Sequence, residues 1–211
     1  LRVELEAAER EVILAGRRAT ALSFNGQVPG PTLHLRPGEK LQVAMVNRLA
    51  TPTNLHVHGL HVSPTGNGDN PFVAIGPGER FEYEFQVPID HPPGTYWYHP
   101  HVHGSVADQV FGGLYGAIII AGEDDPASAR ERLLVISDLT LDGAGRVAAV
   151  SIADVMMGRE GELVLVNGQL NPALSARPGE RERWRVVNAC TSRYLRLDLP
   201  GQHVQLLGLD S

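Results

Sequence analysis

The stretch that decides the fold class is residues 32–47, TLHLRPGEKLQVAMVN, in which two short runs of alternating apolar and polar residues flank a Pro-Gly-Glu turn. Such alternation indicates half-buried β-strands, and Pro-Gly pairs mark turns. The strands expected in this half are Thr32–Arg36, Lys40–Asn47, Asn54–Val62, Arg80–Val87, Thr95–His99 and Gly113–Ile120. Since no helical 3.6-residue stripe of useful length occurs between Thr20 and Ala121, we predict an all-β sandwich or barrel.

The strand pattern restarts after a polar connector, Gly122–Arg132, which contains Glu123, Asp124, Asp125 and Pro126. The further strands expected are Leu133–Leu139, Leu163–Val166, Arg183–Asn188, Tyr194–Leu199 and Val204–Leu209. We therefore predict two domains, residues 1–122 and 123–211. The second domain has only about 80 residues after the connector, fewer than the ~100 residues of a typical β-sandwich. We therefore expect it to be incomplete.

The turn Arg36-Pro37-Gly38-Glu39 has a counterpart, Arg177-Pro178-Gly179-Glu180, and each precedes a strand that ends in Asn. This echo indicates one β-domain plan used twice. Because Pro-Gly-Glu also occurs at Pro77, generic turn chemistry is the alternative.

Composition excludes several function classes. The 211 residues include 18 Lys+Arg against 24 Asp+Glu, and this acidic balance argues against a nucleic-acid or anionic-membrane partner. No apolar run approaches the roughly 18 residues of a membrane span, and Ala117–Ala121 is interpreted as a buried strand. The lone Cys190 excludes an internal disulfide and a multi-cysteine zinc site, and is interpreted as a buried structural thiol.

Two His-x-His pairs carry the chemistry: His56-Val57-His58 and His99-Pro100-His101. Residues i and i+2 of a strand project from the same face, so each pair presents two imidazoles together. Imidazole suits Zn, Cu, Fe and Ni. Two such pairs in one small β-domain predict a metal site whose ligands are His56, His58, His99 and His101.

The remaining histidines give weaker signals. Those that stand alone, His34, His91 and His203, are interpreted as solvated or packed side chains. His61 and His103 lie close to the pairs, and each is either a partner that orients a ligand or a residue that lines the cavity.

Three further side chains call for an interpretation. Met156 and Met157 could donate thioether sulfur to Cu(I), but are better interpreted as hydrophobes that fill gaps. Trp184 alternates with Arg183 and Arg185 on an expected strand and is interpreted as a core residue.

The histidine segments also carry a resemblance. Residues 54–60, NLHVHGL, and 94–104, GTYWYHPHVHG, resemble the first two copper motifs of bacterial laccase-like multicopper oxidases. Phe24–Thr32, Gln109–Ala121 and Leu165–Gly168 resemble further segments of that family, so the resemblance covers nearly the whole chain. It implies cupredoxin-like Greek-key β-domains, the first complete and the second only in part.

By this resemblance, His56 would bind a type 2 copper, while His58, His99 and His101 would bind a type 3 pair. These are half the ligands of a trinuclear cluster that reduces dioxygen to water with electrons from phenols, aromatic amines or metal ions. Asp69 would be a carboxylate that assists proton delivery near the cluster, or else only a turn-forming residue. The resemblance also implies a periplasmic or extracellular location.

Two departures from the family pattern matter. Val57 replaces a frequent Trp, which should alter packing rather than ligation. The His-Cys-His motif of the family's last domain, which holds the type 1 copper, is missing, and no His flanks Cys190. We therefore expect the rest of a longer polypeptide, or a partner chain, to complete the copper site.

Two other readings remain open. A binuclear zinc hydrolase would match His56-x-His58-x-x-His61, but Leu60 occupies the position of an expected Asp ligand. A copper-free, cupredoxin-like structural protein should have lost ligand histidines, whereas all four first-domain positions are filled. Copper bound to the purified protein would support the oxidase, and zinc would support the hydrolase.

Overall fold

A computed structural model describes residues 1–122 and 130–209. The first part contains β1 (Arg2–Leu14), β2 (Arg17–Phe24), β3 (Leu33–Leu35), β4 (Lys40–Asn47), β5 (His56–His58), β6 (Arg80–Gln86), β7 (Gly94–His99), α1 (Val106–Gly112) and β8 (Gly116–Ile120). The second part contains β9 (Arg130–Leu139), α2 (Ile152–Met157), β10 (Leu163–Val166) and β11 (Glu182–Asn188). The all-β prediction is confirmed.

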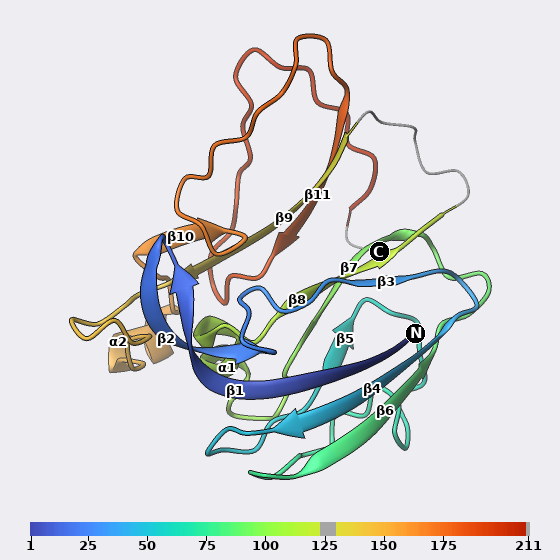
Figure 1. Cartoon of the computed structure of the whole chain (residues 1–211), viewed down its shortest axis with the longest axis vertical. Coiled ribbons are helices and arrows are strands. Elements are labelled where there is room, and N and C mark those ends of the chain that lie inside the picture. The colour runs from blue at the N-terminus through green and yellow to red at the C-terminus, as the bar shows by residue number, and fades with distance from the viewer. Residues whose placement is uncertain (123–129, 210–211) are drawn as a thin grey trace.

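The first part is a sandwich of two four-stranded sheets, ordered β2-β1-β4-β6 and β3-β8-β7-β5 (Figure 1). Both sheets contribute to one core: Leu5 and Met45 come from the first, and Tyr98 and Ile118 from the second. Packing of the apolar face of one sheet against that of another is what removes these side chains from water. The sandwich positions β5 and β7, which carry the histidines.

A third sheet, ordered β10-β9-β11, lies beyond β7 and β8 (Figure 1). A second apolar cluster joins it to the first part, since Ala117 of β8 and Phe111 of α1 pack with Val135 of β9 and Val187 of β11. Every residue of β8 is buried, which explains its unbroken apolar run. The connector residues 123–129 lie outside the described residues, so the division at 122/123 stays a prediction.

The two parts repeat one strand plan. Asn25, after β2, has its side chain bonded to the β1 backbone: it accepts from Glu6 N at 2.7 Å and donates to Glu4 O at 2.9 Å. Asn167, after β10, makes the same pair of bonds to Val135 N and Leu133 O of β9, both at 2.8 Å. β1 pairs in parallel with β4 as β9 does with β11. This supports a plan used twice.

The Pro-Gly-Glu turns do not by themselves carry that repeat. In the turns at Glu39, Glu79 and Glu180, the Glu carboxylate accepts from the backbone N–H three residues earlier, at 3.0, 2.7 and 2.9 Å respectively. Because the turn at Glu79 lies outside the repeated plan and has the same hydrogen bond, this arrangement is generic turn chemistry.

Several predictions of local structure were wrong. Strands β1 and β2 were missed, as was α1, which lies where no helix was expected. Tyr194–Leu199 and Val204–Leu209 form no strand in the described chain, because alternating residues need a neighbouring strand to pair with. Trp184 is half-buried rather than a core residue, because β11 turns Arg185 and Val187 inward.

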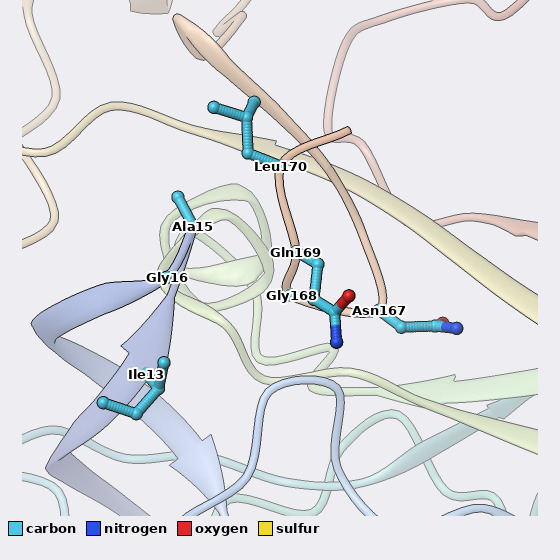
Figure 2. A pocket seen from close by; sticks show the side chains of 7 residues that line it. All are labelled: Ile13, Ala15, Gly16, Asn167, Gly168, Gln169 and Leu170. Atoms are coloured by element: carbon cyan, nitrogen blue, oxygen red, sulfur yellow. The ribbon is translucent and has the colours of Figure 1, made fainter. Parts of the chain in front are cut away.

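A hollow of about 470 Å³ lies where the turn between β1 and β2 meets the turn after β10 (Figure 2). Ala15 N donates to Gly168 O at 2.9 Å across this contact. The described residues that line the hollow include no histidine, so it is separate from the predicted metal site. Of the helices described, none has the length and apolar character needed to cross a membrane.

Arg159 joins the two parts of the chain. Its side chain is buried, with the guanidinium carbon 3.8 Å from the ring centroid of Phe111. Nη1 donates to Asp108 Oδ1 at 2.7 Å, and Nη2 donates to Ala148 O at 2.6 Å. Arg159 therefore anchors α1, the helix that follows the second histidine pair.

We expect Arg159→Ala to lower the free energy of unfolding by about 2–4 kcal/mol, because it removes two charge-assisted hydrogen bonds and a cation–π contact. Urea denaturation checks this. Arg146→Ala is the matched control: its ion pair with Glu9, at 2.9 Å, is half-exposed on both sides and should contribute less than about 1 kcal/mol. Equal losses in the two variants would contradict the anchoring role.

Candidate metal centre

The register of β5 against β7 brings the histidine pairs together. His56 lies opposite His99, and His58 lies opposite Trp97. Residues directly opposite on antiparallel strands share a face of the sheet, and residues i and i+2 do so within a strand. His56, His58 and His99 therefore project from one face, while Val57 is buried in the core.

Three of the imidazoles form a compact group. One ring nitrogen from each of His56, His58 and His99 lies within 4.8 Å of the other two. The ring centroid of His56 is 5.5 Å from that of His58 and 5.2 Å from that of His99. Such convergence is what a metal ion bound by imidazole requires.

His101 lies at the rim of this group, beyond the end of β7. Its ring centroid is 5.2 Å from that of His56 and 6.1 Å from that of His99. His101 is exposed, whereas His99 is buried. The structure thus places all four histidines together, three of them in the tighter group.

Hydrogen bonds to Nδ1 set the orientation of two rings. His99 Nδ1 lies 2.8 Å from Pro100 O, and His56 Nδ1 lies 2.9 Å from Asp69 Oδ2. A carbonyl or carboxylate oxygen only accepts, so in each ring Nδ1 carries the proton and Nε2 holds the lone pair. This is the arrangement in which a metal-ligating histidine is usually held.

His99 Nε2 is a buried nitrogen that has no hydrogen-bond partner among the described residues. Buried polar atoms are nearly always paired, so an orphaned lone pair inside a group of imidazoles fits a metal ligand. The pKa of His99 is lowered to about 3, mainly by burial and in part by the charges of the neighbouring His56, His58 and His101, while the hydrogen bond to Pro100 O opposes the shift. His99 is therefore neutral at pH 7, as a ligand must be.

The lowered pKa of His99 predicts how the stability of the metal-free chain depends on pH. An unfolded histidine has a pKa near 6.5, so between about pH 3 and 6.5 the unfolded chain binds a proton at His99 that the folded chain does not. The free energy of unfolding should fall as pH drops below 6.5, by up to about 1.4 kcal/mol per pH unit. Urea titrations at pH 7, 6 and 5 measure this. Replacement of His99 by Phe should flatten the slope, and an unchanged slope would contradict the assignment.

Asp69 lies beside the group. Both carboxylate oxygens approach His56 Nδ1, at 3.0 and 2.9 Å, and Oδ1 also accepts from Val57 N at 3.2 Å. Its backbone N–H donates to Ser63 O at 2.8 Å within the preceding turn. Asp69 thus belongs to a turn and contacts a predicted ligand as well.

The other histidines lie outside the group. His91 is a packed residue, as expected: Nδ1 lies 2.9 Å from Pro92 O, and Nε2 accepts from His61 N at 3.1 Å. The His61 ring packs against His91, with centroids 4.9 Å apart. The remaining three are exposed: His34, His103 and His203.

Two interpretations of the sulfur side chains need correction. Met156 and Met157 fill no gap, because both are exposed on α2, a six-residue helix on the surface of the described chain. Cys190 is a free thiol that is half-buried rather than buried. Burial and the nearby Asp138 raise the pKa of Cys190 to about 12, so it stays a thiol at neutral pH.

Two contributors to the site were not found from the sequence. Trp97 stacks on His99 with ring centroids 4.2 Å apart, and lies 5.3 Å from the ring of His58. Asn54 bonds to the backbone of His101 at 2.5 Å. The position of Trp97, two residues before His99 on one strand face, was the available signal; nothing local indicates the contact of Asn54.

Comparison with known proteins decides the family. The family profile described as "Multicopper oxidase" matches residues 6–125, more than half of the chain. The chain belongs to the multicopper oxidase family. The matched residues include all four histidines of the group, and the resemblance inferred from the sequence is confirmed.

Individual multicopper oxidases that are similar to this chain agree with the family assignment. MmcO of Mycobacterium tuberculosis is 28% identical over 93% of this chain and 44% of its own length. A crystal structure from Pseudomonas thermotolerans has a TM-score of 0.83 and 31% identity, covering 95% of this chain and 49% of that one. The solved structure described as "Multicopper oxidase from Campylobacter jejuni: a metallo-oxidase" has a TM-score of 0.76 and 37% identity, covering 90% of this chain and 40% of that one. The cupredoxin-like fold is thereby confirmed, and the chain spans less than half the length of each relative.

Proposed function

We propose that this chain contributes copper ligands to a laccase-like oxidase. The whole protein would couple one-electron oxidation of phenols, aromatic amines or metal ions to the four-electron reduction of dioxygen to water. The observation that carries the proposal is the buried, unpartnered Nε2 of His99 within a group of imidazoles, in a chain of the multicopper oxidase family.

Four residues would hold copper: His56 a type 2 ion, and His58, His99 and His101 a type 3 pair. Copper, when bound, supplies one-electron redox chemistry and a site for dioxygen. The type assignments rest on the resemblance of the two His-x-His segments to the family motifs. Convergence of the four rings from β5 and from the end of β7 supports their use as metal ligands.

Asp69 would have two tasks. Its carboxylate holds His56 with Nε2 turned away from it, which keeps one lone pair available for metal. The same carboxylate is partly exposed, so it can exchange a proton with water at an oxygen atom beside the site. This partial exposure supports a role for Asp69 in delivering protons for the reduction of dioxygen.

The alternatives find less support. In a binuclear zinc hydrolase the position of Leu60 should carry a carboxylate ligand, but Leu60 is buried in the sandwich core. A copper-free structural protein would have no need of an orphaned buried nitrogen at His99. We further infer a periplasmic or extracellular location, which cell fractionation tests.

Copper content and oxygen consumption of the complete oxidase test the proposal. His58→Ala or His101→Ala should empty or disable the type 3 pair while the β-fold, followed by circular dichroism, survives. A normal copper count and normal oxygen uptake in either variant would refute its assignment.

A further inference from the structure

The Asn54 side chain connects the segments that form the metal site. Asn54 lies two residues before His56 and is 1% exposed. Its Oδ1 accepts from the backbone N–H of His101 at 2.5 Å, and its Nδ2 donates to Val73 O at 2.9 Å. Both functions of one amide are therefore satisfied by backbone groups far away in sequence.

His101 needs such a contact because the sheet does not hold it. The pairing of β5 with β7 ends at His99, which lies opposite His56. Pro100 has no N–H to donate, so the chain leaves the ladder there. The first backbone N–H past that point belongs to His101, and its acceptor is the Asn54 side chain.

The second bond of Asn54 reaches the loop that carries Asp69. Val73, whose carbonyl accepts from Asn54, is four residues beyond Asp69, and Val73 N donates to Asn70 O at 3.2 Å within the same loop. Asp69 in turn contacts His56 Nδ1. A single amide thus ties together the His56 segment, the His101 segment and the Asp69 loop.

We propose that Asn54 is a positioning residue of the metal site, which sets the place of His101 relative to His56 and His58. The inference rests on the proposed function, since the position of His101 matters only if the group binds copper. Only an amide supplies both an acceptor and a donor here: Asp retains the acceptor alone, and Leu retains neither.

Competition titration of the 211-residue chain with Cu(II), read by EPR, tests this together with thermal unfolding of the metal-free chain. Asn54→Leu should weaken Cu(II) binding by about 10- to 100-fold, the usual effect of losing a partner that orients a ligand. Asn47→Leu is the matched control. Asn47 is also buried: it accepts from Leu49 N and donates to Thr51 O and Ile75 O, and none of these hydrogen bonds goes to a histidine or to the Asp69 loop residue Val73. It should lower the Tm without weakening Cu(II) binding, and equal losses of affinity would overturn the proposal.

Asn54→Asp keeps the acceptor for His101 and decides the question if Asn54→Leu does not fold. It should lower the Tm through the lost donor to Val73, yet keep the His101 amide protected from hydrogen exchange and the Cu(II) spectrum close to that of the unmodified chain. Loss of the spectrum in a folded Asn54→Asp protein would overturn the positioning role. If the unmodified chain bound no Cu(II), the proposed function would fail along with it; if Asn54→Leu bound as tightly as the unmodified chain, only the positioning role would fail.

Discussion

Copper binding is expected to disappear when His99 is replaced by phenylalanine and to persist when His91 is. Both side chains are buried histidines, 5% and 3% exposed, but their ring nitrogens are used differently. His99 leaves Nε2 unpaired, whereas His91 bonds through both nitrogens to the backbone of Pro92 and His61. The His99 ring therefore has a nitrogen available to bind metal, whereas the His91 ring uses both nitrogens to stabilise the fold.

The stabilities should separate in the opposite direction. Removal of an unpaired buried nitrogen is nearly neutral, so the metal-free His99→Phe chain should lose only the bond to Pro100, about 1 kcal/mol. His91→Phe leaves two buried backbone groups without their hydrogen-bond partner, and should lower the free energy of unfolding by about 2–4 kcal/mol. Cu(II) titration and urea denaturation of both variants measure this. A His99→Phe chain that still binds Cu(II) like the original would contradict the role of His99.

Gly113→Ala is expected to destabilise the chain by about 3–5 kcal/mol, through backbone strain and overpacking together. Gly113 ends α1 with φ of 122°, a conformation that side-chain-bearing residues rarely adopt. A Cβ there would lie 2.3 Å from the carbonyl oxygen of Leu22, which belongs to the backbone of β2 and cannot move aside cheaply.

The effect should reach the metal site through α1. Gln109 of this helix accepts from Thr53 Oγ1 and donates to Pro52 O, both at 2.8 Å, next to the segment that carries His56. Cu(II) affinity should therefore fall together with the Tm. Gly16→Ala is the control, because Gly16 also has a positive φ, 75°, but no atom within 4 Å of an added Cβ. It should cost about 1–2 kcal/mol, and equal losses in the two variants would contradict the packing argument.

The sequence predicts several strands, and the histidine pairs of the site, because their signals are local. Alternation over Lys40–Asn47 matches β4, and two His-x-His pairs at strand positions predict four converging rings. β1 was missed because charged residues such as Glu9 and Arg10 interrupt its alternation. α1 was missed because it is seven residues long and is stabilised by packing that involves the second part of the chain, including Val135.

What the sequence does not predict depends on contacts between distant residues. The bond from Asn54 to His101 spans 47 positions, and the bond from Arg159 to Asp108 spans 51. Neither has a periodic signal, because each results from where the sheets place two loops. Tyr194–Leu199 shows the converse: it alternates like a strand, yet the described chain offers it no paired neighbour.

Equilibrium dialysis of the purified chain against equal concentrations of Cu(II) and Zn(II), followed by metal counting and EPR, tests the central claim most directly. The account predicts retained copper with nitrogen couplings from histidine, and little zinc, since imidazole sites bind Cu(II) more tightly than Zn(II). Retention of zinc in preference to copper, or of neither metal, would contradict it.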